Sequence, residues 1–148
     1  MFDVFTPFSV GLVYLMHRSF QQVSLHKPNT SRPANSERYL VCKWKRHDAG
    51  DIEDYLLVVN NRLNQLGLDL LGSTRSTVDV VQLVPPDVME DEFRQYIVDN
   101  NNLMGERQII GLAKIAAFCK NDQLTEPRYS PARPRFSSEK THLRLNIG

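Results

Sequence analysis

Cysteine and long apolar runs are scarce in this sequence. Its two cysteines, Cys42 and Cys119, have no partner at metal-ligand spacing, so we expect no metal site. Each lies in an apolar run, so we expect both to be reduced core residues, which is typical of an intracellular protein. The uncharged run 4–16 has only 13 residues, too few to span a bilayer, and Asp3 stands where a signal peptide carries basic residues. We therefore expect neither a membrane anchor nor a signal peptide.

Glycine is also scarce, and no glycine-rich turn of the kind that binds a nucleotide cofactor is present. The 7 glycines are scattered rather than spaced as G-x-G-x-x-G. At 41% hydrophobic and 24% charged residues, the rest of the composition is that of an ordinary globular domain. The net charge of +1 hides an uneven distribution, because 21–47 is rich in Lys and Arg with Glu37 as its only acid. Such a local basic segment indicates an anionic partner.

This basic segment is centred on a polar loop between two predicted strands. The runs 23–26 and 39–42 are short and β-favouring, and KPNTSRPANSER joins them. A helix precedes them, capped by Thr6 and ending near Phe20, after a strand-like fragment at 1–5. The order predicts an α/β fold, with apolar strands of a sheet buried on both faces and a terminal antiparallel hairpin.

Helices dominate the predicted second half. Its elements are, in order, a helix from Asp51 to Leu66, a loop at 67–77, a strand at 78–83, a helix opened by Asp87 and Glu90, and a helix at 109–118. Proline and arginine alternate from 125 onward. We therefore expect a folded domain at 1–124 and an extended or disordered tail at 125–148.

The loop and the strand after it resemble a motif of the FtsJ-like RNA ribose 2′-O-methyltransferases. In that family KPxxSRxxxSE precedes an apolar strand that closes the catalytic domain. This sequence matches the pattern in order at Lys27, Pro28, Ser31, Arg32, Ser36 and Glu37. The runs FDVFTPFSVGLVYLM, TSRPANSERY, NRLNQL and LTEPR are similar to the cap-specific branch, which methylates the first transcribed nucleotide of capped mRNA.

The resemblance implies a nuclear, Rossmann-fold enzyme that transfers a methyl group from S-adenosylmethionine to a ribose 2′-hydroxyl of capped mRNA. The family uses a Lys-Asp-Lys-Glu tetrad, and Glu37 matches its fourth member. A lysine must position or deprotonate the weakly nucleophilic hydroxyl, and the carboxylate orients that lysine. The neighbouring loop residues are expected to contact the RNA or its cap: Lys27, Ser31, Arg32, Asn35 and Ser36.

In the family, the cofactor loop and the other three tetrad residues lie upstream of the position that matches Met1. We therefore expect S-adenosylmethionine to bind outside these residues, and the chain to be the inactive C-terminal part of a methyltransferase, from a truncated gene model, a split gene or a degenerate paralogue. Two alternatives stay open. One is a non-catalytic RNA-binding or partner-binding remnant. The other is an enzyme acting on ribosomal or transfer RNA, which is disfavoured because the run TSRPANSERY is similar to the cap-specific branch.

Overall fold

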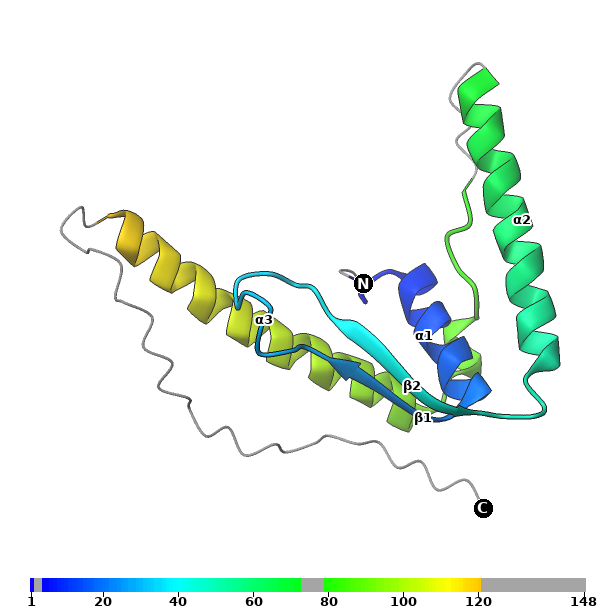
Figure 1. Ribbon diagram of the computed structural model, residues 1–148, viewed down its shortest axis with the longest axis horizontal. Coiled ribbons are helices and arrows are strands. Elements are labelled where there is room, and N and C mark those ends of the chain that lie inside the picture. Colours follow the sequence, from blue (N-terminus) through cyan, green and yellow to red (C-terminus); the bar gives the residue numbers. More distant parts are fainter. Residues whose placement is uncertain (2–3, 73–78, 121–148) are drawn as a thin grey trace.

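A computed structural model describes residues 1, 4–72 and 79–120 (Figure 1). Its elements in chain order are α1 (Pro7–Ser19), β1 (Phe20–His26), β2 (Tyr39–Lys45), α2 (Gly50–Gly72), the 3-10 helix η1 (Pro86–Val88) and α3 (Asp91–Cys119). Figure 1 shows α1 and the two strands at the centre, α2 projecting to one side and α3 extending past the strands on the other. The predicted tail, 125–148, lies outside the described residues.

The two strands form the antiparallel hairpin that the sequence predicts. Leu25 lies opposite Leu40, and His26 lies opposite Tyr39. Because side chains alternate along a strand, one face of the hairpin turns Val23 and Leu25 into the core while the other leaves Tyr39 exposed. Both strands are longer than the apolar runs that predicted them, since the ladder continues with Gln22 opposite Lys43 and Phe20 opposite Lys45.

Each edge of the hairpin has a partner near the connecting loop. On the β1 edge, the Leu25 N–H donates to the Tyr96 hydroxyl of α3 at 2.8 Å. On the β2 edge, Met1 and Arg38 exchange both backbone hydrogen bonds, at 2.8 and 2.9 Å, as in an antiparallel ladder. The strand expected at 1–5 is nevertheless wrong for its described residues 1, 4 and 5, which lie in no strand. Both strand edges thus meet other parts of the chain beside the loop.

The core lies between α1, the inner face of the hairpin and the first half of α3. Val13, Leu25 and Phe93 are among its buried side chains. The segment 79–85 crosses α1 so closely that a Cβ on Gly11 would lie 3.0 Å from the Leu83 Cβ. The strand expected at 78–83 is therefore wrong for the described residues 79–83, which lie in no strand and bury Leu83 against α1 instead.

The helices of the second half are longer than predicted. Residues 67–72, expected in a loop, continue α2, since one interior glycine costs only about 1 kcal/mol and good helix formers flank it. The two helices expected after residue 87 are one, α3, which runs through three consecutive asparagines and Gly105. The capping-box prediction is also wrong, because Asp87 lies in η1 and Glu90 caps α3 without a side-chain bond.

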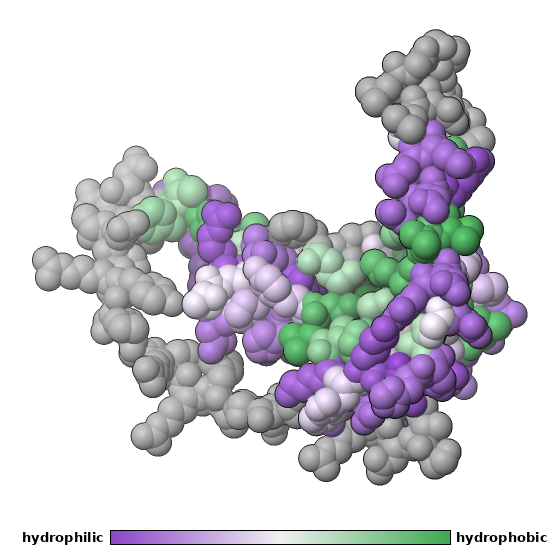
Figure 2. Space-filling model, turned by 45° about the vertical axis from the view of Figure 1, so that its right-hand side comes forward, coloured by the Kyte–Doolittle hydropathy of each residue, from purple (hydrophilic) through white to green (hydrophobic). Residues whose placement is uncertain are grey.

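Apolar side chains remain exposed along the last part of α3. They are Ile109, Ile110, Leu112, Ile115 and Phe118, between 41% and 68% exposed. Figure 2 shows this green surface at the far end of the helix, apart from the apolar area at the centre of the view. No helix in the described ranges is long and apolar enough to cross a membrane.

Candidate active site

Glu37, the predicted catalytic residue, lies at the end of the loop that joins β1 to β2. Its side chain is half-buried, and its Oε1 accepts a hydrogen bond from the Tyr39 hydroxyl at 2.8 Å. Its backbone N–H donates to the Asn35 Oδ1 at 3.1 Å. The bond to the carboxylate raises the pKa of Tyr39, because it stabilises the protonated phenol. A carboxylate held in this way can accept a further hydrogen bond from an ammonium group.

Lys27 holds the loop together from the inside. Its Nζ donates to the Ser31 hydroxyl at 3.1 Å, to the Glu37 carbonyl at 3.4 Å, and to the Asn35 carbonyl. Burial lowers the pKa of Lys27, with the cations Arg38 and Arg107 acting in the same direction and Glu37 opposing them. The ammonium group therefore joins three points of the loop and fixes the path of the chain up to Glu37.

The other predicted contact residues differ in exposure. Arg32 is exposed, whereas Ser31, Asn35 and Ser36 are half-buried. Two turns, each closed by a backbone hydrogen bond of 3.0 Å, shape this part of the loop. The Ser31 N–H donates to the Pro28 carbonyl, and the Asn35 N–H donates to the Arg32 carbonyl. The structure thus brings all six predicted site residues into one loop, with Lys27 at its centre and Arg32 on its outside.

Arg38 belongs to the basic segment 21–47, from which the sequence predicts an anionic partner, but it is buried. It is only 1% exposed, and its Nη1 donates to the Asn100 and Asn101 Oδ1 atoms of α3 at 2.8 and 2.7 Å. Its guanidinium carbon also lies 5.7 Å from the centroid of the Phe5 ring. The expectation that the bases of 21–47 face an anionic partner is therefore wrong for Arg38. The only signal in the sequence was the run of three asparagines inside a helical pattern, where amides are unfavourable without partners.

The middle of the loop rests on α3. A Cβ on Gly111 would lie 3.0 Å from the Ala34 backbone nitrogen and 3.2 Å from the Pro33 carbonyl carbon. Three residues earlier on the helix, the Gln108 Nε2 donates to the Ala34 carbonyl at 3.4 Å. Sequence reasoning missed this support, because nothing local to the loop or to the helix links the two segments.

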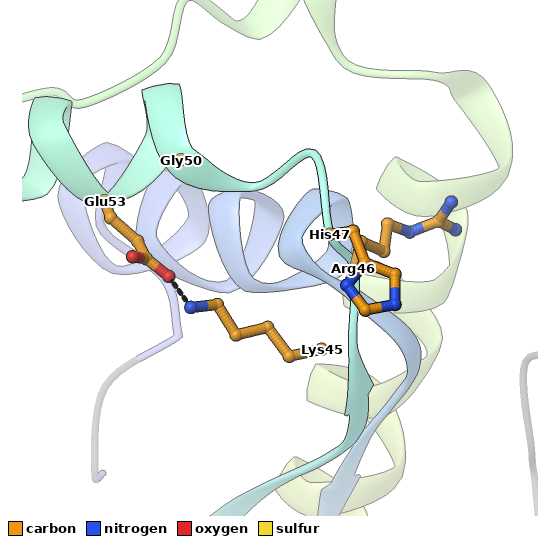
Figure 3. A pocket seen from close by; sticks show the side chains of 5 residues that line it. All are labelled: Lys45, Arg46, His47, Gly50 and Glu53. Carbon is orange, nitrogen blue, oxygen red and sulfur yellow. Dashed lines mark ion pairs between the residues drawn. The ribbon is translucent and has the colours of Figure 1, made fainter.

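A second basic group lies at the other end of the hairpin, in the turn from β2 to α2. Figure 3 shows a pocket there lined by Lys45, Arg46, His47, Gly50 and Glu53. Lys45 forms an ion pair with Glu53, while Arg46 points away from that pair and donates from Nε to the Phe20 carbonyl at 3.4 Å. The pocket lies at the opposite end of the hairpin from the loop that carries Glu37, so it is not part of the candidate site.

The cysteines and acids of the described residues form no group that could hold a metal ion. Cys42 is half-buried, and burial raises the pKa of its thiol. Cys119 is exposed at the end of α3, so the expectation of a core position is wrong there. The reason is that the apolar run around it belongs to the part of α3 that extends past the other helices and strands of the described residues (Figure 1).

Comparison with known proteins relates the loop to one family. Residues 1–45, which carry α1, the hairpin and the loop, match the FtsJ-like methyltransferases. Cap-specific mRNA (nucleoside-2'-O-)-methyltransferase 1 of Drosophila melanogaster is 51% identical over 137 residues, which is 90% of this chain and 17% of that protein. The Homo sapiens protein of the same name is 48% identical over 134 residues, 89% of this chain and 15% of that protein. The chain thus spans about a sixth of the length of these relatives.

Proposed function

We propose that this chain forms the C-terminal part of a Rossmann-fold methyltransferase domain, because residues 1–45 match the FtsJ-like methyltransferases. Its substrate is capped mRNA, and the group methylated is the ribose 2′-hydroxyl of the first transcribed nucleotide. The identity to cap-specific relatives over about 90% of the chain supports this substrate. The single observation that carries the proposal is Glu37, a carboxylate fixed by Tyr39 at the end of the matching loop.

The role of Glu37 is to orient and charge-balance a lysine contributed from outside these residues. A ribose hydroxyl is a weak nucleophile, so that lysine must position or deprotonate it, and a fixed carboxylate holds the lysine in one place. The bond from Tyr39 restricts the rotation of the carboxylate, which favours one direction of approach. Glutamate at this point therefore acts in the chemical step rather than in binding.

S-adenosylmethionine supplies the methyl group when it is bound, but the described residues do not fit it. The strand-to-helix turn among them, at 46–49, carries Arg46, His47 and Asp48 where a cofactor loop needs glycine for close backbone approach. This chain therefore contributes the carboxylate and the RNA-facing loop, while the cofactor is held elsewhere.

The exposed part of the loop is the RNA-binding part. Arg32 is the exposed cation of the loop, so it contacts a phosphate or the cap, with Ser31 and Ser36 beside it. Lys27 and Asn35 assist RNA binding by shaping the loop. The substrate also implies a nuclear location, which imaging of the tagged protein tests.

A hybrid enzyme tests the proposal directly. The matching segment of the Drosophila melanogaster relative is replaced by this chain, and methyl transfer and capped-RNA affinity are measured. Glu37→Gln should abolish turnover and leave RNA affinity unchanged, because glutamine keeps the size of the side chain but not its charge. The control is Glu106→Gln, an exposed acid on α3. Near-normal turnover of the Glu37→Gln hybrid would assign the tetrad to another residue, and an inactive parent hybrid that still binds RNA would favour a non-catalytic remnant.

A further inference from the structure

The residue after Glu37 joins three segments that are distant in sequence. The Arg38 backbone exchanges two hydrogen bonds with Met1, and its guanidinium group donates to Asn100 and Asn101 of α3. Asn101 makes a further contact, because its Nδ2 donates to the Val4 carbonyl at 2.9 Å. One amide side chain therefore fixes both the residue beside the candidate carboxylate and the segment that pairs with it.

The burial of Arg38 argues for a geometric role. Taking a cation out of water is costly, and well-packed apolar residues of similar volume often stabilise a protein as well or better. A guanidinium group does supply fixed directions for its N–H bonds. In Arg38, two bonds from one nitrogen end on adjacent residues of a helix, which restricts rotation of the side chain about its long axis.

The helix that carries the asparagines also holds the loop itself. Gly111 lies against Pro33 and Ala34, and Gln108 donates to the Ala34 carbonyl. From Asn100 to Gly111 is eleven residues, about 17 Å along a helix at 1.5 Å per residue. The helix thus touches the loop at its middle and at the residue after Glu37, and the carboxylate lies between these two points in sequence.

We propose that Asn101, with Asn100, positions the Glu37 carboxylate by fixing Arg38, so that α3 is a positioning element of the candidate active site. The catalytic consequence rests on the proposed function, whereas the mechanical part does not. Asn101 acts through Arg38 on the orientation of the chain at Glu37, and it also holds the segment around Met1 beside it.

The test uses hydrogen exchange on the full chain, with Asn102 as a matched control. Asn102 is exposed on the same turn of α3. Asn101→Leu should speed exchange at the Glu37 and Arg38 amides by about tenfold, the effect of losing a hydrogen bond to a charged group. Exchange at Ser24 and Val41, opposite each other in the hairpin, should stay unchanged, and Asn102→Leu should change none of the four.

Further variants separate positioning from general stability. Asn101→Asp keeps an acceptor for Arg38 and should restore slow exchange at Glu37 and Arg38. Unchanged exchange in Asn101→Leu would overturn the proposal, and so would an equal increase at all four amides. If Asn101→Leu fails to fold, Asn100→Leu, which removes one of the two acceptors, decides by the same criteria.

The hybrid enzyme then tests the catalytic consequence. There Asn101→Leu should lower kcat about tenfold with unchanged RNA affinity, while Asn102→Leu has no effect. Unchanged kcat in a hybrid whose Glu37 amide exchanges faster would overturn the effect on catalysis. Because exchange needs no turnover, the two proposals fail separately. If the parent hybrid is inactive but Asn101→Leu speeds exchange at Glu37 and Arg38, only the methyltransferase function is contradicted. If the parent hybrid is active but Asn101→Leu leaves exchange unchanged, only the positioning role is contradicted.

Discussion

Replacing Lys27 by methionine distinguishes a lysine that shapes the loop from one that contacts RNA. The structure gives its ammonium group three acceptors within the loop, at Ser31, Asn35 and Glu37. A hydrogen bond from a charged donor contributes about 1.5–3 kcal/mol, but the freed groups can turn to water here, so we count one such bond, or about 2 kcal/mol. That corresponds to about thirtyfold faster exchange at the Glu37 amide.

The salt dependence of RNA binding is the second measurement on Lys27→Met. Each phosphate contact on single-stranded RNA contributes about 0.7 to the slope of log affinity against log salt concentration. We expect the slope to be unchanged in the hybrid enzyme with Lys27→Met, because the ammonium group is engaged within the loop. Arg32→Met is the opposite case, with a slope reduced by about 0.7 and unchanged exchange at Glu37. A reduced slope with slow loop exchange in Lys27→Met would refute our reasoning and assign the ammonium group to RNA.

Three more predictions concern stability, the support of the loop and activity. Burial lowers the pKa of His17 below its ordinary 6.5, more than the nearby Glu90 raises it. The unfolded chain therefore binds more protons, and the free energy of unfolding should fall as the pH drops through 6.5. Urea unfolding should show this loss of stability, and His17→Phe, which keeps an aromatic ring beside Phe93, should remove it. Gly111→Val should speed exchange at the Asn35 and Glu37 amides, because the valine side chain displaces the loop. Gly105→Val should not, because no atom other than those of its own stretch of helix lies within 4 Å of a Cβ there; equal effects of the two variants would contradict the support of the loop by α3. The 148-residue chain alone, given labelled S-adenosylmethionine and capped RNA, should transfer no methyl above a blank, since under the proposed function Glu37 is its one contribution to the tetrad. Clear transfer would refute this.

Features set by neighbouring residues could be predicted from the sequence. The first helix follows from Thr6, whose hydroxyl accepts a bond from the Ser9 N–H at 3.3 Å, and from the proline after it. The hairpin follows from two β-favouring runs around a proline-rich loop, and pairing between adjacent strands needs no distant contact. The position of Glu37 at the end of that loop follows from the same local pattern.

Features set by distant contacts could not be predicted. Two helices were expected where α3 is one, and its three consecutive asparagines have low helix propensity. The bonds from Arg38 to two of these asparagines offset that cost. An arginine in a polar loop is expected at the surface, and the burial of Arg38 depends on amides more than 60 residues away in sequence. The contact between Gly111 and the loop could not be predicted for a similar reason. A glycine in a helix indicates close packing, but the sequence does not show which segment packs against it.

The long separation between loop and helix also sets an order of folding. The hairpin joins residues no more than 25 apart, Phe20 and Lys45, whereas Arg38 meets Asn100 and Asn101 across 62 and 63 residues. Contacts with short loops close first, because closing a longer loop costs more entropy. Synthesis adds about 5–20 residues per second. The hairpin therefore leaves the ribosome and forms well before α3 has been synthesised. The loop around Glu37 reaches its final shape only when the helix arrives, so the site matures late even though its residues are made early.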